Sequence, residues 1–329
     1  MGKWLKTTEL IRFDVQDRVA RITLNRPDKR NALSTALVRE LHDALWEADD
    51  RTDVNVIILE GAGKDFCAGY DLVTTYSDRK ADDTSDAPAQ GASHATPGQS
   101  REGCPGPTMS RRTPAQEEVV YRSAAGTYDD DCWQMEATQR LTNALFDLHK
   151  PVIAKIQGNC LAGGTDLAFM CDMVIAAEDA RIGFPATRAN GTPPTHMWVY
   201  HLGPQWAKRM LMTGDCLHGR DAARVGLVLD AVPADQLDAA VNELARRVSF
   251  VDSEMLAAHK RVVNMALEIQ GARTLQRCAA EMDARGHLSK GPRRTQFKQD
   301  MATVGLKQAL KNRDEPFGDG MVKAHWLSK

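Results

Sequence analysis

The sequence lacks the features that would place it in a membrane or secreted class. No apolar run approaches the ~18 residues that a transmembrane helix needs, and the first residues lack the apolar stretch of a secretory signal. Charge of one sign is not in excess either, since 42 basic and 44 acidic side chains give a formal net charge of -2. This balance gives no reason to expect nucleic acid or a membrane surface as a partner. We therefore expect a cytoplasmic protein.

Motifs for metals, disulfides and nucleotides are also missing. The seven cysteines are scattered and include no C-x-x-C pair, which argues against a zinc site and against a disulfide framework. Neither a G-x-G-x-x-G fingerprint nor a G-x-x-x-x-G-K-[ST] loop occurs. We expect no metal ion, no dinucleotide and no nucleoside triphosphate.

The apolar residues, 43% of the chain, are arranged as alternating strands and helices. Residues 19–24 alternate apolar and polar side chains, which predicts a strand. Ser34 then precedes leucines at 37, 41 and 45, a spacing that predicts a helix, and the apolar run at 55–60 predicts a strand buried on both faces. This order of elements favours an α/β fold.

A second set of elements follows, and the chain then becomes mainly helical. Patterns predict a helix at 135–148, a strand at 151–157, a glycine-containing turn at 158–164, a buried helix at 165–170, and strands at 173–177 and 180–184. From residue 203 onward, helices are predicted at 205–213, 220–225, 234–249 and 253–269, with one brief strand at 227–232. We predict a core over 1–202 and a helical C-terminal region over 203–329.

A polar segment interrupts the core at about 73–131. It is rich in Ser, Asp, Gly, Pro and Thr and has almost no aliphatic residues, a composition typical of a long loop. Such loops are either lids and binding elements or poorly ordered linkers, and the composition favours neither.

Two glycine-containing turns are the best candidates for chemistry. They are FCAGYDL at 66–72 and GNCLAGGTDL at 158–167, and each follows an apolar strand. Small residues let backbone N–H groups approach a ligand, and two such groups on one oxygen form an oxyanion hole worth ~3 kcal/mol per donor. Either turn alone is weak evidence, because a glycine after a strand is usually only a turn.

Taken together and in order, these segments resemble a known family. The stretches LNRPDKRNALS, VIILEGAGKDFCAGYDL and KPVIAKIQGNCLAGGTDLAFMCDMVIAAEDARIGFP are similar to the successive signatures of the crotonase superfamily, the enoyl-CoA hydratase/isomerase family. GPQWAKRMLMTGDCLHGRDAARVGLVLDAV also resembles the stretch before the family's helical tail. The resemblance covers residues 9–73 and 131–266, and the polar segment between them is an unusually long insertion.

The resemblance implies a spiral core of repeated ββα units and a C-terminal helical region that assembles a homotrimer or a dimer of trimers. It implies an acyl-CoA thioester as substrate, with coenzyme A carried by the substrate and no other cofactor. The backbone N–H groups of Ala68 and Gly163 would hold the thioester oxygen. Contacts with CoA would come from Lys29, Arg30, Ala32, Asp71, Leu72 and Lys260. Of these, Lys29, Arg30 and Lys260 could equally be ordinary solvated charges.

The sequence departs from the family pattern at its two acidic positions. A hydratase of this family uses two glutamates on one water molecule, and the first corresponds here to Asp166, which is one methylene shorter. The second corresponds to Ala186, which cannot transfer a proton. Asp166 could also simply cap a helix. We therefore expect slow hydration of simple 2-enoyl-CoA.

Three interpretations remain open at this point. Asp166 could work in an enoyl-CoA hydratase or isomerase, a hydrolase or a decarboxylase, with a partner from a group that includes Tyr70, Tyr128, Thr187, Arg188, His94 and His196. The protein could be a weak hydratase that relies on Asp166 and the oxyanion hole. It could also be an acyl-CoA binder without catalysis. His196 could equally be a packed histidine among apolar neighbours.

Overall fold

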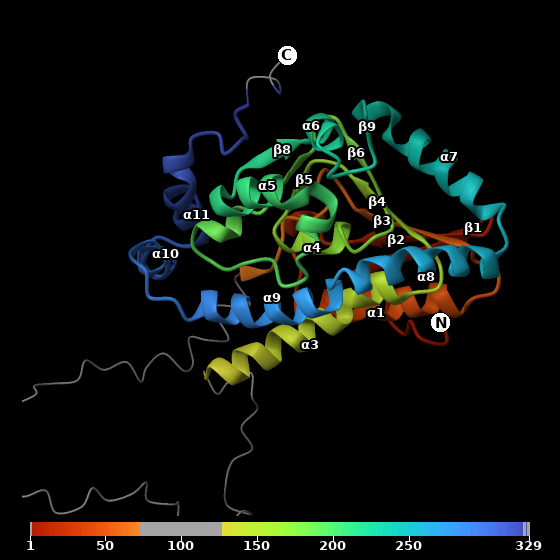
Figure 1. Ribbon diagram of the computed structural model, residues 1–329, viewed down its shortest axis with the longest axis horizontal. Coiled ribbons are helices and arrows are strands. Elements are labelled where there is room, and N and C mark those ends of the chain that lie inside the picture. The colour runs from red at the N-terminus through yellow and green to blue at the C-terminus, as the bar shows by residue number, and fades with distance from the viewer. Residues whose placement is uncertain (1, 73–126, 325–326, 328–329) are drawn as a thin grey trace, which may run out of the picture.

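The chain forms a mixed α/β structure with a helical C-terminal region (Figure 1). The computed structural model describes residues 2–72, 127–324 and 327. Helices pack around a central sheet, and α3 (Tyr128–Asp147) and α9 (Ala272–His287) lie side by side along one edge of the molecule (Figure 1). The sheet and helices share one large apolar core.

The central sheet has six strands in the order β1-β2-β3-β4-β6-β9. The pair β1 and β2 is antiparallel, and every later neighbour pair is parallel. All six residues of β3 are buried, as expected for an apolar run in a parallel sheet covered on both faces. The strand bounds are Ile11–Gln16 for β1, Val19–Leu24 for β2, Val56–Gly61 for β3, Val152–Ile156 for β4, Met173–Ala177 for β6 and Asp230–Val232 for β9.

A second, three-stranded sheet has the order β5-β7-β8. Its strands are β5 (Asn159–Leu161), β7 (Arg181–Gly183) and β8 (Cys216–His218). The pair β5 and β7 is parallel, whereas β7 and β8 are antiparallel.

The helices begin where the sequence provides caps and apolar spacing. Ser34 caps α1 (Thr35–Asp50) by accepting a 3.3 Å hydrogen bond from the Leu37 amide, and the leucines at 37, 41 and 45 are buried as their spacing predicts. The remaining α-helices before α9 are α4 (Gly163–Ala168), α5 (Trp198–Thr213), α6 (Gly219–Arg224), α7 (Leu237–Ser249) and α8 (Ser253–Ile269). Beyond α9 come α10 (Pro292–Thr303) and α11 (Leu306–Asp314).

Four short 3-10 helices complete the described elements. They are η1 (Pro27–Lys29), η5 (Pro185–Arg188), η6 (Ala234–Gln236) and η7 (Glu315–Phe317). Two of them lie in segments that the sequence analysis named. The helix η1 lies in the LNRPDKRNALS stretch, and η5 contains Ala186.

Most predicted elements are found close to their predicted bounds, and the domain boundary is the main correction. The strand at 19–24 and the helix at 253–269 have the predicted bounds. Both β8 and β9 follow residue 203, yet β8 pairs with β7 and β9 pairs with β6. The sheet core therefore extends to Val232, and a boundary at 203 is too early. Gly203 has a non-helical φ of 70°, and the helix continues on both sides of it.

The polar segment lies mostly outside the described residues. Its positions 73–126 are not described, and its last positions from Tyr128 onward already belong to α3. Thr127 caps α3 by accepting a 3.2 Å hydrogen bond from the Asp130 amide.

The two glycine-containing turns lie side by side because their backbones pair like parallel strands. Cys67 and Cys160 form the bridge between them. The Cys67 amide donates to the Asn159 carbonyl at 2.9 Å, and the Leu161 amide donates to the Cys67 carbonyl at 3.0 Å. This pairing joins two segments that lie about ninety positions apart in the sequence and places them at one site.

A side chain at Gly164 would break this pairing. A Cβ atom there would lie 2.5 Å from the Cys67 carbonyl oxygen, which is rigid backbone. We expect Gly164→Ala to reduce the free energy of unfolding by about 1–3 kcal/mol, as measured by urea denaturation. Gly291→Ala is the matched control, because nothing lies within 4 Å of its Cβ position. Equal effects in the two variants would contradict this close approach.

Candidate active site

The turn at 66–72 approaches the start of α4 at Gly69. Gly69 has a φ of +103°, and a Cβ atom at this position would lie 2.9 Å from the Leu161 carbonyl and 3.3 Å from the Gly163 nitrogen. The ring of Tyr70 packs against Gly163, because a Cβ atom on Gly163 would lie 3.0 Å from Tyr70 Cε2. The backbone of both turns therefore meets around Gly69, Tyr70 and Gly163.

The backbone amides at this meeting point correct one predicted donor. The Ala68 amide already donates to the Arg30 carbonyl at 2.9 Å, so it is not available to a ligand as the sequence predicted. The Tyr70 and Gly163 amides have no hydrogen-bond partner among the described residues. Each turn thus has an amide available at the meeting point, Tyr70 on the first and Gly163 on the second, and Tyr70 takes the place of Ala68.

The carboxyl group of Asp166 lies in the first turn of α4 and is almost fully buried. Its Oδ2 accepts a hydrogen bond from the Tyr70 hydroxyl at 3.1 Å, and its Oδ1 accepts one from the Thr195 hydroxyl at 2.6 Å. Both donors are neutral hydroxyls. A carboxylate has about four lone-pair sites, so these two bonds leave room for a proton-transfer partner.

Burial changes the acidity of this group strongly. Burial, which disfavours the charged form, raises the pKa of Asp166 from 3.8 to about 7, although the hydroxyls of Thr195 and Tyr70 oppose the rise and the charge of Asp283 adds to it. The pKa of the Tyr70 phenol is raised well above its usual value by burial and by the nearby carboxyl groups. Tyr70 therefore stays a hydrogen-bond donor while Asp166 titrates near neutral pH.

Thr195 is a site residue that the sequence reasoning missed. It comes just before His196, one of the predicted candidate partners, but a threonine after two prolines carries no chemical pattern. His196 has a φ of +46°, its Nδ1 is buried without a hydrogen-bond partner, and burial lowers its pKa. No hydrogen bond joins His196 to Asp166 among the described residues.

The other candidate partners of Asp166 are not brought to it. The Tyr128 hydroxyl donates to the Glu281 carbonyl, and the tyrosine is exposed. Thr187 is half-buried in η5, where no side-chain contact to Asp166 is found within the described part of the chain. His94 lies outside the described residues.

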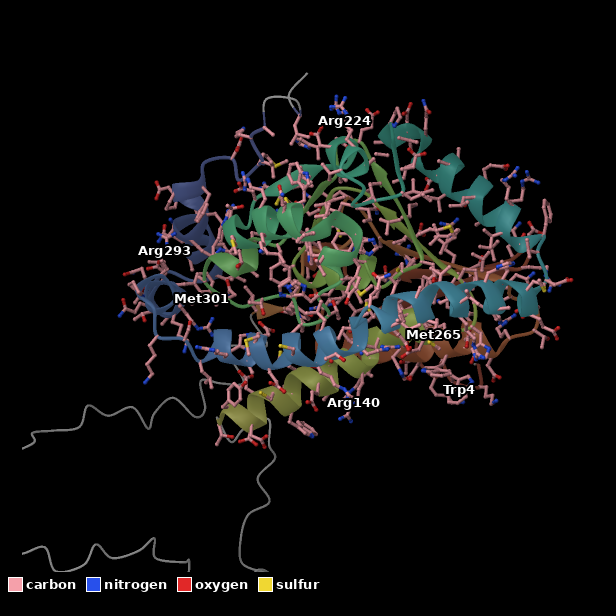
Figure 2. All side chains as sticks on the ribbon, in the orientation of Figure 1. Trp4, Arg140, Arg224, Met265, Arg293 and Met301 are labelled. Carbon is pink, nitrogen blue, oxygen red and sulfur yellow. The ribbon has the colours of Figure 1, made fainter. Side chains whose placement is uncertain are left out.

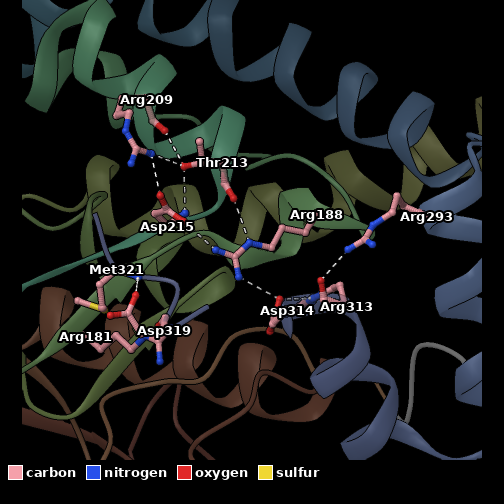
Figure 3. A network of polar contacts seen from close by, with 10 residues as sticks. All are labelled: Arg181, Arg188, Arg209, Thr213, Asp215, Arg293, Arg313, Asp314, Asp319 and Met321. Atoms are coloured by element: carbon pink, nitrogen blue, oxygen red, sulfur yellow. Dashed lines mark hydrogen bonds and ion pairs between the residues drawn. The ribbon is translucent and has the colours of Figure 1, made fainter. Parts of the chain in front are cut away.

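Arg188 is engaged elsewhere, in a network that fixes the segment after Ala186 (Figure 3). Its buried guanidinium bonds Asp215 at 3.0 Å, Asp314 at 3.1 Å and the Thr213 carbonyl at 3.0 Å, and it stacks on the Phe317 ring at 4.0 Å. Arginine provides donors in a fixed planar arrangement that suits several acceptors at once. Arg188 therefore ties η5 to α11 and η7 and is no partner for Asp166.

Most residues predicted to contact CoA lie together along the first turn. The amide of Leu33 donates to the Gly69 carbonyl at 2.8 Å, which places the 29–32 segment beside residues 68–72. Arg26, which the sequence reasoning missed, bonds both the Ala32 carbonyl at 2.5 Å and the Asp71 carboxylate at 2.9 Å. Within this group Lys29 and Arg30 are exposed, Ala32, Asp71 and Leu72 are half-buried, and Leu72 packs against α10 and α11.

Lys260 is a structural residue, which corrects its predicted role at CoA. Its ammonium group is buried and donates to the Leu145 carbonyl at 3.0 Å and the Lys150 carbonyl at 3.1 Å. It also forms an ion pair with Asp172 at 2.8 Å. The three donors of an ammonium are thereby used inside the protein, and none is left for a phosphate.

A known protein family matches most of this chain. A family model described as enoyl-CoA hydratase/isomerase matches residues 14–94 and 119–293. The chain belongs to the enoyl-CoA hydratase/isomerase family. This family membership confirms the resemblance of the motifs.

Individual members of the family match this chain along most of their length. EchA13 of Mycobacterium tuberculosis is 32% identical over 80% of this chain and 76% of that protein. The hydroxycinnamoyl-CoA hydratase-lyase of Pseudomonas fluorescens is 27% identical over 94% of this chain and 96% of its own. The crystal structure of an enoyl-CoA hydratase from Mycobacterium smegmatis covers 96% of this chain and 97% of its own, with 32% identity and a TM-score of 0.77. The predicted α/β crotonase fold is confirmed.

Two absences hold for the described part of the chain. None of the helices there is both long and apolar enough to cross a lipid bilayer. Within the same residues, no group of three or more His, Cys, Asp or Glu side chains is arranged to hold a metal ion.

The raised pKa of Asp166 has a consequence for stability. The folded state binds this proton more tightly than the unfolded state, so stability falls as pH rises from about 4 to about 7 and is then constant. An asparagine side chain does not ionise, so it lacks this loss of stability with rising pH. We expect the stability of Asp166→Asn relative to the wild type to increase by up to about 4 kcal/mol between pH 4 and pH 8.

Urea denaturation at several pH values measures this difference. The exposed carboxylate of Asp179 is the control, and Asp179→Asn should show a nearly constant difference over the same range. A constant difference for Asp166→Asn as well would show that its carboxyl is not held neutral in the folded protein.

Proposed function

We propose that this protein moves a proton on the acyl chain of a CoA thioester, next to the thioester carbonyl, with Asp166 as the single acid–base group. The reaction that such a site supports best is the interconversion of 3-enoyl and 2-enoyl thioesters. The observation that carries this proposal is one buried carboxyl, with a pKa of about 7, beside two available backbone amides.

The two available amides provide the anion-stabilising part of the site. We propose that the N–H groups of Tyr70 and Gly163 donate to the thioester oxygen. Removal of a proton from C2 places negative charge on that oxygen, and each fixed amide donor aimed at it is worth ~3 kcal/mol in the transition state. The pairing of the two turns holds both donors in place before substrate binds, which is the condition for this stabilisation.

One carboxyl group is sufficient for isomerisation. Asp166 as carboxylate takes the proton from C2 of the 3-enoyl thioester, and the electron pair delocalises through the double bond onto the thioester oxygen. The same carboxyl then returns the proton to C4, which leaves the double bond between C2 and C3. No atom is gained or lost. A base with a pKa near the working pH is well suited to both steps.

Hydration needs more than this site supplies. Addition of water requires one group to accept a proton from water while another delivers a proton to C2, and the family's second acidic position is Ala186. This argument favours isomerisation over hydration.

We propose that the binding site for CoA lies beside the first turn. Lys29 and Arg30 are exposed there and carry positive charge suited to phosphate groups, while Ala32 and Leu72 offer backbone and apolar contacts. The ion pair of Arg26 with Asp71 fixes the turn that these residues share.

The reaction type can be tested by turnover of a set of CoA thioesters: saturated, 2-enoyl, 3-enoyl, 3-hydroxy and β-keto. We expect 3-enoyl thioesters to be isomerised and 2-enoyl thioesters to be hydrated slowly, below the ~10 s⁻¹ of a typical enzyme. Asp166→Asn should lower the isomerisation rate by about 10²–10⁴ with little change in CoA thioester binding. Wild-type activity should rise with pH through about 7, as the carboxyl ionises.

Two results would contradict the proposal. Hydration of a 2-enoyl thioester at ordinary enzyme rates would show that a second acid–base group exists. Unchanged turnover in Asp166→Asn would remove the proposed base, and binding without any turnover would favour an acyl-CoA binder.

We also propose that a second copy of this chain covers the exposed apolar face of α8. The helix presents large apolar side chains to solvent, and Met265 is labelled among them in Figure 2: Met255, Val262, Val263, Met265 and Ile269, which are 52% to 79% exposed. Lys260 is the one buried residue of this helix. An apolar face of this kind is typical of a protein–protein interface, which agrees with the trimer or dimer of trimers expected from the family resemblance.

Light scattering after size-exclusion chromatography tests this assembly. We expect a mass of about three or six times the chain mass of 36.2 kDa. The double variant Val262→Lys, Val263→Lys should be largely monomeric, because two charges cannot be buried without partners. Leu229→Lys is the matched control, since Leu229 is 61% exposed outside α8. A monomeric wild type would contradict the proposal.

A further inference from the structure

A second buried carboxyl group lies on α9, a helix of the C-terminal region, close to the site. Asp283 is 4% exposed, and its Oδ1 accepts a hydrogen bond from the Thr192 amide at 2.7 Å. Its carboxylate occupies the space beside Gly191, where a Cβ atom would lie 2.2 Å from Oδ1. Only a glycine at position 191 allows this approach. The family motifs do not include Asp283, and the function described so far does not use it.

The segment that Asp283 holds, residues 191–195, lies between Ala186 and the carboxyl group of Asp166. The amide of Gly191 donates to the Ala186 carbonyl at 3.3 Å, so Asp283 lies close to the position where the second acid is missing. Three residues after Thr192, the hydroxyl of Thr195 donates to Asp166 at 2.6 Å. The 191–195 segment is therefore fixed between two buried carboxyl groups, one at each end.

The same segment is attached to the helices behind it. The side-chain amide of Gln139 on α3 donates to the Pro194 carbonyl at 2.6 Å and to the Gln276 carbonyl of α9 at 2.7 Å. These bonds join α3, α9 and the segment to one another.

The surroundings decide which of the two carboxyl groups ionises first. His287 Nε2 lies 3.7 Å from Asp283 Oδ1, and the charge of Arg294 on α10 also favours ionised Asp283. Within the described residues, Asp166 has no ion-pair partner and only the hydroxyls of Tyr70 and Thr195 as side-chain donors. Of two interacting carboxyl groups, the one with nearby cations loses its proton at lower pH.

We propose that Asp283 is a positioning residue of the active site: it holds the segment that carries Thr195, and its charge acts on Asp166 across that segment. This inference rests on the proposed role of Asp166 as the base. Its effect is to make Asp166 a stronger base than burial alone would, because a base whose ionised form is repelled takes up a proton more readily.

The charged and titratable groups that face Asp283 come from several elements. His287 lies on the same helix, Asp131 on α3, Arg294 on α10, and Asp166 on α4. The Nδ1 of His287 lies 3.1 Å from Asp131 Oδ2, so the imidazole is shared between two carboxylates. Burial raises the pKa of Asp283 itself, while His287, the Thr192 amide and Arg294 lower it.

Difference infrared spectroscopy of the full-length protein tests this coupling without any activity measurement. The signal is the C=O stretch of the protonated Asp166 carboxyl, assigned by its loss in Asp166→Asn. We expect Asp283→Asn, which keeps an acceptor for the Thr192 amide, to move the titration midpoint of Asp166 down by at least about half a pH unit. The acid limb of the pH–rate profile should move by the same amount.

Glu281→Gln is the matched control, because it removes one negative charge from the exposed side of the same helix and should leave the midpoint unchanged. His287→Gln is a second test that leaves Asp283 in place. It removes a group that favours ionised Asp283, so the Asp166 midpoint should again fall.

An unmoved Asp166 midpoint in Asp283→Asn overturns the proposal, even where turnover falls, because a purely structural residue would give that result. If Asp283→Asn does not fold, an unmoved midpoint in His287→Gln overturns it instead. Failure of the proposed function is distinguishable: Asp166→Asn would then retain turnover, while the infrared titration would still report whether Asp283 and Asp166 interact.

Discussion

The candidate site depends on one backbone interaction, the parallel pairing of Cys67 with Cys160. It brings together two turns from distant parts of the chain, and the amides of Tyr70 and Gly163, one from each turn, find no acceptor in the part of the chain that the structure describes. The Tyr70 side chain then reaches Asp166, which lies one helical turn beyond Gly163. Because backbone hydrogen bonds fix this arrangement, the donors and the carboxyl keep their relation independently of the substrate.

Burial gives this arrangement its chemistry. An exposed aspartate would be ionised at neutral pH and would be too weak a base to remove a proton next to a carbonyl. Here the surrounding apolar core and two hydroxyl donors hold the carboxyl near the point where both forms are populated. The free energy of unfolding is therefore lower at high pH, where the buried carboxyl is ionised. Such a loss of stability is common at sites that hold a group in an unfavourable state.

Much of the fold and part of the site could be predicted from the sequence, because both rest on local patterns. Alternation marked β2, apolar spacing marked α1 and α8, and the glycine-containing turns marked the two segments that meet. The prediction of Ala68 as a donor was wrong, because a motif does not show which amides already donate to a carbonyl elsewhere in the fold. Lys260 was wrong for a related reason: a lysine on a helix reads as a surface charge, and only packing reveals three acceptors around it.

The contribution of the C-terminal helices was not predictable from local patterns. Arg188 and Asp283 act through contacts with residues about one hundred positions away, and no periodicity or motif records such contacts. The close approach of Asp283 to Gly191 also makes these two positions depend on each other in one direction. Any side chain at 191 would meet the carboxylate, so the present position of Asp283 requires a glycine there, whereas a glycine at 191 does not require the acid.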